Sequence, residues 1–187
     1  MKKCTTYTLG KTIISSEYDK YPMDDIYGTY GNKLKPGCII RADGKFYEDI
    51  PEDNEDDDGY PIYEVPKIRG EYSFFYPSDT GEKIGTSGYR KYALENYKRM
   101  CDYQNNHWSY LVIKCETFIN TDSGLSDSVF DTLCSVESDG GKEYIKEIID
   151  DLKSNVKGQL EKTGFSKDEI NLSIDNSETK KGEMYLW

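Results

Sequence analysis

From residue 108 to 160, a run rich in β-branched and aromatic residues is followed by apolar residues at helical spacing. Residues 108–119 are rich in β-branched and aromatic side chains, which predicts a strand, and a polar turn at 120–124 ends it. A second extended run covers 129–136. Apolar residues then recur on one helical face: Tyr144, Ile145, Ile148, Ile149, Leu152, Val156 and Leu160. The pattern predicts a β-β-α core unit over 108–160.

Both ends of this helix carry capping residues. Ser138 or Asp139 is expected to accept hydrogen bonds from the amides of its first turn, and Gly164 to end it in a left-handed conformation. Glu137 and Asp139 also resemble a pair of catalytic carboxylates. Because free amides and the helix dipole favour carboxylates at a helix N-terminus, we interpret this pair as capping.

The pattern outside the core unit is weaker. It predicts extended segments at 5–14, 38–41, 45–47 and 71–76, the middle two forming a hairpin through Asp43-Gly44. The Tyr-, Asp- and Gly-rich stretch 17–31 is typical of an irregular loop. A helix is expected at 89–105, with one face made of Tyr92, Ala93, Tyr97, Met100 and Cys101.

The C-terminal part carries three further features. Ser166 to Glu169 has the form of a capping box for one short turn, and 171–175 is expected to form a closing strand. The apolar residues 185–187 either dock on the core or touch a partner. Together these elements predict an α+β fold with one domain over residues 1–187: a mainly antiparallel sheet covered by two helices, with a projecting acidic loop at about 48–60.

Charge is concentrated in one place. The chain has 24 Lys and Arg against 35 Asp and Glu, a net charge of −11. Ten acids and one lysine between residues 43 and 65 account for −9 of it, so the rest of the chain is nearly balanced. An acidic chain is repelled by nucleic acid, so we expect no direct nucleic-acid binding and favour a basic protein partner.

Cysteine usage and hydropathy indicate the compartment. The five cysteines form no Cys-x-x-Cys pair, and no apolar segment follows Met1. We therefore expect reduced thiols, a cytoplasmic location and no membrane partner.

The acidic segment has three interpretations. The simplest is a solvated loop. The second is a calcium site, because the series from Asn54 through Asp56 and Asp58 to Gly59 copies the first half of an EF-hand loop. Val65 stands where a bidentate glutamate is needed, so an EF-hand is disfavoured.

The third interpretation is mimicry of nucleic acid. Closely spaced carboxylates can occupy a groove built for phosphates, and nearby tyrosines can pack where bases would lie. The candidate partner-binding residues are Glu48, Asp49, Glu52, Asp53, Glu55, Asp56, Asp57, Asp58, Tyr60 and Tyr63.

Other candidate sites are weaker, and we assign no catalytic residue, metal site or cofactor. His107, the one histidine, is expected to finish the turn from a helix to a strand. The glycine-rich stretch 81–88 lacks the Gly-Lys-Ser/Thr ending of a phosphate-binding loop, and we expect a loop and a helix start there.

Four short motifs between residues 92 and 165 carry a resemblance: Tyr97-Lys-Arg-Met100, Trp108-Ser-Tyr110, Val136-Glu-Ser-Asp139 and Glu143-Tyr144. With them the chain resembles an uncharacterised family carried by phages, prophages and plasmids. Where that family has a Leu-Trp-Gly segment, Leu133-Cys134-Ser135 stands here. The resemblance implies a mobile-element origin.

Charge and resemblance together favour one function over two alternatives. The favoured function is a phage-encoded acidic inhibitor of the anti-CRISPR or antirestriction type, whose partner is a host nucleic-acid-directed defence protein, a Cas nuclease or a restriction enzyme. One alternative is a small metal-dependent enzyme that acts on a nucleotide or nucleic acid, with Asp53, Asp56 and Asp58 as ligands. The other is a phage structural or adaptor protein.

Overall fold

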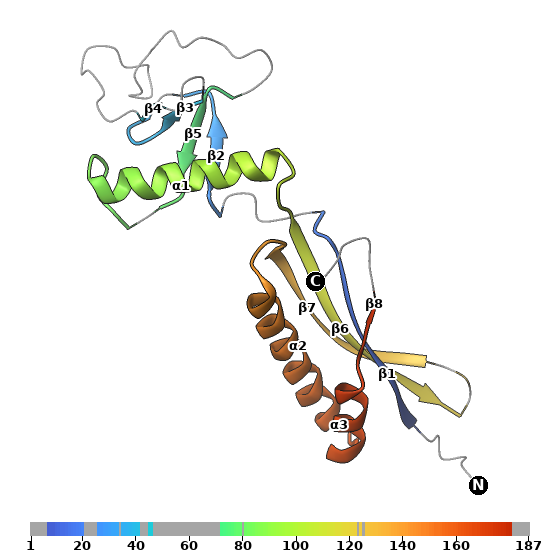
Figure 1. Cartoon of the computed structure of the whole chain (residues 1–187). Coiled ribbons are helices and arrows are strands. Elements are labelled where there is room, and N and C mark those ends of the chain that lie inside the picture. Colours follow the sequence, from blue (N-terminus) through green and yellow to red (C-terminus); the bar gives the residue numbers. More distant parts are fainter. Residues whose placement is uncertain are drawn as a thin grey trace. The chain divides into compact units, whose positions relative to one another are not determined.

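The computed structural model describes residues 7–20, 26–33, 35–41, 45–46, 72–79, 81–122, 124 and 126–180, with the backbone alone at 40, 45 and 46. The chain divides into two compact units. Unit 1 comprises Met1–Pro22 and Trp108–Trp187, and unit 2 comprises Met23–His107. Each unit combines helix with sheet and has its own hydrophobic core, which confirms the predicted α+β class (Figure 1). The predicted single domain stays a prediction.

Unit 1 has a four-stranded sheet in the order β7-β6-β1-β8. The neighbours are antiparallel except β8, which runs parallel to β1. Its elements are β1 (Tyr7–Tyr18), β6 (Tyr110–Thr121), β7 (Ser126–Glu137), α2 (Lys142–Lys162), α3 (Lys167–Asp175) and β8 (Glu178–Lys180). The predicted β-β-α core unit therefore forms as β6, β7 and α2.

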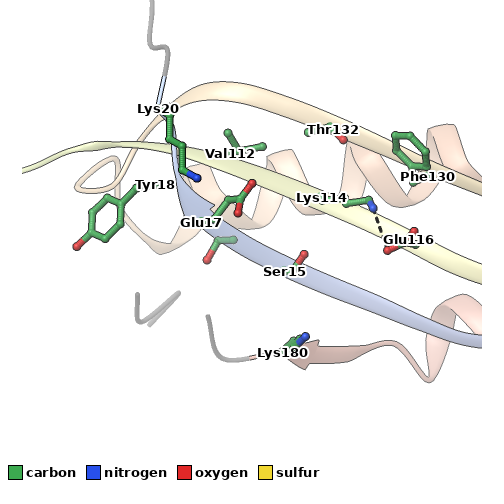
Figure 2. A pocket seen from close by; sticks show the side chains of 11 residues that line it. Ser15, Glu17, Tyr18, Lys20, Val112, Lys114, Glu116, Phe130, Thr132 and Lys180 are labelled. Carbon is green, nitrogen blue, oxygen red and sulfur yellow. Dashed lines mark ion pairs between the residues drawn. The ribbon is translucent and has the colours of Figure 1, made fainter. Parts of the chain in front are cut away.

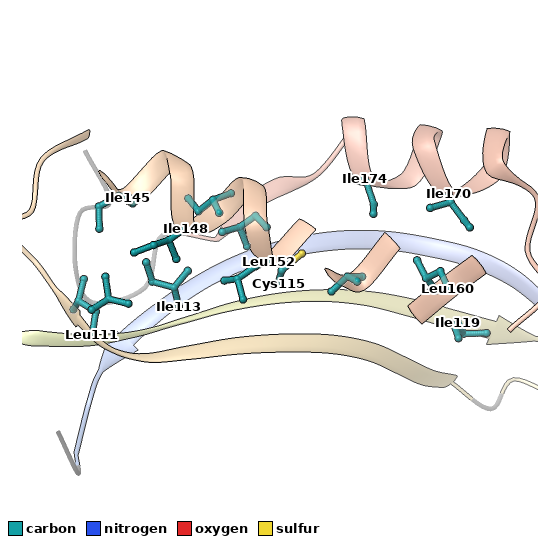
Figure 3. Close-up of a cluster of buried hydrophobic side chains, with 14 residues drawn as sticks. Leu111, Ile113, Cys115, Ile119, Ile145, Ile148, Leu152, Leu160, Ile170 and Ile174 are labelled. Carbon is teal, nitrogen blue, oxygen red and sulfur yellow. The ribbon is translucent and has the colours of Figure 1, made fainter. Parts of the chain in front are cut away.

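The core of unit 1 lies between this sheet and the helices α2 and α3. Along β6, Leu111, Ile113 and Cys115 are buried and alternate with half-buried residues at 112, 114 and 116. Figure 3 shows them facing the apolar side of α2. The predicted helix face is buried except at Tyr144, which is 38% exposed. Each fully buried Leu or Ile contributes about 1.5–3 kcal/mol to folding.

One prediction for the ends of α2 is wrong and one is confirmed. Its N-cap is Gly141, and no side chain caps it. Ser138 instead closes the end of the β6–β7 pair, where its hydroxyl accepts a hydrogen bond from the Ser109 amide at 2.9 Å. At the other end Gly164 has a φ of +94°, the expected left-handed conformation.

The closing strand was predicted in the wrong place. Residues 171–175 belong to α3, and the strand that closes the sheet is β8. The spacing of Ile170 and Ile174 explains the difference, since both are buried and residues four apart share a helical face. The capping box of Ser166 and Glu169 is confirmed, and it starts a helix of 9 residues rather than a single turn.

Unit 2 has an antiparallel sheet in the order β2-β5-β3-β4. Its elements are β2 (Gly28–Gly31), β3 (Ile39–Ile40), β4 (Lys45–Phe46), β5 (Phe74–Pro77) and α1 (Ser87–Gln104). Pairing of β3 with β4 confirms the predicted hairpin strands, whose turn residues lie outside the described part of the chain. The loop prediction for 17–31 is only partly right. Gly28 belongs to β2, which pairs with β5, and this position needs glycine because a Cβ there would lie 2.2 Å from the Tyr76 carbonyl oxygen.

Helix α1 begins at its N-cap Thr86, whose hydroxyl accepts a hydrogen bond from the Tyr89 amide. Tyr89, Ala93 and Met100 are buried against β3 and β5. Of the predicted face, Tyr92 is instead 46% exposed. Among the described helices, none is long and apolar enough to cross a membrane.

Candidate functional site

The main candidate site is a groove on the sheet of unit 1, with a volume of about 790 Å³. Figure 2 shows it on the face turned away from α2. The lining residues come from all four strands and from the chain just after β1: Ser15, Ser16, Glu17, Tyr18, Lys20, Val112, Lys114, Glu116, Phe130, Thr132 and Lys180. We call this site the sheet groove.

Strand alternation places two charged residues and a valine of β6 in the groove. Val112, Lys114 and Glu116 are half-buried and alternate along β6 with core residues that face α2. Successive side chains of a strand point to opposite faces of the sheet. Since one face of β6 is covered by α2, the side chains on its other face line the groove.

An ion pair lies in the middle of the groove. Lys114 Nζ is 2.9 Å from a carboxylate oxygen of Glu116 and 4.5 Å from the centre of the Phe130 ring. The Ser128 hydroxyl donates to Glu116 at 2.7 Å. Burial alone raises the pKa of Glu116, but the hydrogen bonds from Lys114 and Ser128 and the Lys114 charge outweigh it, so the pKa is lowered. The carboxylate is therefore held charged and in place, which suits binding rather than proton transfer.

The long edge strand β7 is protected against pairing with another strand. Its Ser128 amide donates to the Asp127 carboxylate at 2.8 Å, and its Thr132 amide donates to Asp131 at 2.9 Å. The Gln159 side chain of α2 donates to the Phe130 carbonyl oxygen. Since these outward backbone groups already have partners, strand addition at β7 is disfavoured.

A second cluster lies in unit 2 around Arg41. Its guanidinium lies 4.7 Å from the centre of the Tyr30 ring and donates to the Tyr72 carbonyl oxygen at 3.0 Å. Phe75 packs against Tyr30 and Tyr97, with ring centres 5.2 and 5.4 Å apart. This cluster stiffens the sheet at the point where β3 pairs with both β4 and β5, the strands that flank the acidic segment.

The sequence-predicted partner residues, Glu48 to Tyr63, lie outside the described residues, as does the EF-hand-like series. His107 is exposed, with Nδ1 at 3.2 Å from the Asp102 carboxylate, and it follows α1 as expected. The stretch 81–88 forms the expected loop and helix start, with Thr86 as the cap. In the described part of the chain, no three His, Cys, Asp or Glu side chains are grouped to hold a metal ion.

Two buried cysteines are unsuited to nucleophilic chemistry. Burial raises the pKa of Cys115 to about 11, and it also raises the pKa of Cys38. The thiolate is the reactive form, so both side chains act as small apolar residues in their cores.

Sequence reasoning missed the sheet groove and the Arg41 cluster. The charged residues Lys114 and Glu116, which alternate with the apolar Ile113 and Cys115, would have indicated a strand with one polar face. The strand order that brings Phe130, Ser15 and Lys180 to that face depends on pairing between distant segments.

Comparison with protein-family models, curated proteins and solved structures gave no match. The resemblance to a mobile-element family therefore stays a prediction that rests on the sequence motifs.

Proposed function

We propose that this protein is a non-enzymatic inhibitor that binds a host nucleic-acid-directed defence enzyme, a Cas nuclease or a restriction enzyme. Its acidic segment, residues 48–60, would occupy the basic channel that the enzyme uses for nucleic acid. The observation that carries the proposal is the concentration of −9 of the net charge of −11 between residues 43 and 65. Such an inhibitor would act in the host cytoplasm.

The charge of the surrounding unit strengthens the argument. Residues 26–41 and 72–107 of unit 2 contain eight lysines and arginines against four acids. The negative charge is therefore one local patch and not a property of the whole surface. A local patch of this kind raises the rate of encounter with a basic groove, and its orientation guides docking.

The anchoring of the segment also supports this function. Strands β4 and β5 both pair with β3, so the strands that come before and after residues 48–60 lie about two strand spacings, or ~10 Å, apart. A segment held at both ends loses less conformational freedom on binding than a free tail does. The exposed ring of Tyr72, just before β5, offers aromatic contact area on the same unit.

The test is a pull-down from bacterial lysate at low and at high salt. We expect a Cas nuclease or restriction enzyme to be recovered at low salt and lost at high salt, because salt screens exposed charges over about 10 Å at 0.1 M. Recovered enzyme is then assayed for nucleic-acid cleavage with and without the protein.

Two variants with equal charge changes make the test specific. The first replaces five acids of the segment with amides: Asp53, Glu55, Asp56, Asp57 and Asp58. The control replaces five exposed acids of α2 in the same way: Glu143, Glu147, Asp150, Asp151 and Glu161. We expect inhibition to be lost in the first variant only. Equal inhibition by both variants, or capture that does not respond to salt, would overturn the proposal.

A further inference from the structure

The side of the unit 1 sheet that is turned away from α2 and α3 has complementary residues at equal distances on the two sides of one row. In this row, which we call the central row, Ile14 of β1 lies between Cys115 of β6 and Thr179 of β8. Because successive side chains of a strand point to opposite faces, the residues one and three positions away from the row point outward. Figure 2 shows Lys114 and Glu116 on this side, which we call the outer sheet face.

Opposite charges stand one position away from the central row, on its two sides. On one side, Glu116 of β6 and Glu178 of β8 lie beside the same residue of β1. On the other side, Lys114 of β6 and Lys180 of β8 lie beside the same residue of β1. Each acid therefore has a lysine at the equal distance across the row in its own strand.

The same rule holds three positions away from the central row. In β1, Lys11 stands on the side of the acids and Glu17 on the side of the lysines. Lys11 lies on the outer sheet face, since its Nζ is 2.7 Å from a carboxylate oxygen of Glu178. In β6, Phe118 stands on the side of the acids and Val112 on the side of the lysines. An apolar residue thus has an apolar counterpart, and each charge has an opposite one.

We propose that the outer sheet face binds the same face of a second copy of this chain, related by a two-fold axis parallel to the central row. A half-turn about this axis places Glu116 opposite Lys114 of the second copy. It places Glu178 opposite Lys180 of the second copy, and it brings the apolar residues of the two β6 strands together. Two packed sheets cross at about 30°, so the positions next to the central row keep this alignment best.

The ion pair within each copy is compatible with this contact. Lys114 Nζ lies 2.9 Å from a carboxylate oxygen of Glu116 in one chain. In the dimer, these two side chains and their copies form a square in which the neighbours of each charge have the opposite sign. Such a network offsets the loss of water at an interface better than one isolated pair does.

The size of the face fits a weak dimer. Strands β1, β6 and β7 have 12 residues each. Three such strands cover about 40 by 14 Å, or on the order of 1,100 Å² for the two copies together. This area is at the lower end of the range for specific interfaces, so we expect a Kd in the micromolar range. A two-fold contact is isologous, so association stops at two copies, and it uses the face of the sheet rather than the protected edge of β7.

The test is a charge swap in the full-length protein, followed by sedimentation equilibrium at about 0.15 M salt, where exposed charges more than about 8 Å apart are screened. Lys114→Glu places acids opposite acids in the dimer, and Glu116→Lys places lysines opposite lysines. We expect each variant alone to dimerise at least about tenfold more weakly than the parent. In an equimolar mixture, the acids of one variant face the lysines of the other, so we expect a Kd within about threefold of the parent value.

Two variants of α2 serve as controls. Lys146→Glu and Glu147→Lys make the same charge changes at exposed positions of a helix that packs on the other face of the sheet. Alone or mixed, both should dimerise as the parent does. Circular dichroism checks that every variant is folded.

Three results would rule out the two-fold contact. In the first, the parent stays monomeric at concentrations far above the micromolar range. In the second, Lys114→Glu and Glu116→Lys each dimerise as tightly as the parent, which would assign association to another surface, such as the apolar residues 185–187 outside the described residues. In the third, the mixture of these two variants dimerises no better than each alone. The contact uses none of the acidic residues 48–60, so its failure and the failure of the proposed function are distinguishable.

Discussion

Three hydroxyl groups inside unit 1 form a series of hydrogen bonds, and each bond in the series has a defined donor. Thr12 Oγ1 lies 2.8 Å from Thr117 Oγ1 and 2.9 Å from Ser173 Oγ, and Ser173 donates to the Gly10 carbonyl oxygen. A hydroxyl has one hydrogen. Since Ser173 gives its hydrogen to Gly10, Thr12 must donate to Ser173, and Thr117 must donate to Thr12.

This direction makes the two threonines unequal, although both are 0% exposed. Thr117→Val removes the first donor and leaves Thr12 bonded to Ser173, so we expect a loss of about 1 kcal/mol in the free energy of unfolding. Thr12→Val removes the middle hydroxyl of the series. The buried Thr117 hydroxyl then loses Thr12 as its acceptor, and we expect a loss of about 2–3 kcal/mol in the free energy of unfolding.

The double variant provides the critical measurement. With both threonines replaced by valine, no buried Thr117 hydroxyl is left without its acceptor. We therefore expect the double variant to be more stable than Thr12→Val alone, with a coupling energy of about 1–2 kcal/mol.

The assay is urea unfolding followed by circular dichroism, with an unchanged slope as evidence that the folded state is preserved. If Thr117→Val costs as much as Thr12→Val, or if the two losses simply add, the inferred direction of donation is wrong.

Two further predictions concern the sheet groove and the edge of β7. Because the pKa of Glu116 is lowered below its ordinary 4.5, its charge contributes stability above that pH which is lost as pH falls through the folded-state pKa. The difference in melting temperature between the parent and Glu116→Gln should therefore shrink in acid; a constant difference would contradict this. Replacing Asp127 and Asp131 with alanine should free the outward amides of β7 and cause concentration-dependent self-association in sedimentation experiments. A variant that stays as monodisperse as the parent would refute this protective role.

Elements with a clear pattern of apolar residues in the sequence were predicted well. The helix from 142 to 162 follows from apolar residues at a spacing of 3.6, and burial confirms nearly the whole predicted face. The two strands before it follow from extended runs, the first rich in β-branched and aromatic residues. Errors arose where one composition suits two structures. Glycines at 28 and 31 suggested a loop, yet they let β2 approach β5 closely.

The candidate site was less predictable than the fold. The acidic segment is visible in the sequence because charge is a property of composition. The sheet groove is not, because its residues come from four segments that meet only through strand pairing. Pairing depends on contacts between residues more than 100 positions apart, such as Thr12 and Thr117.

By itself, the sequence determined the α+β class, the β-β-α core unit and the location of the negative charge, because local propensity, periodicity and charge are read along the chain. Only the tertiary structure decided the division into two compact units, the N-cap of α2 at Gly141 and the groove on the face turned away from α2. The physical reason is that a side chain's partners are set by which distant segments pack beside it. Ser138, for example, closes a sheet end instead of capping the helix next to it.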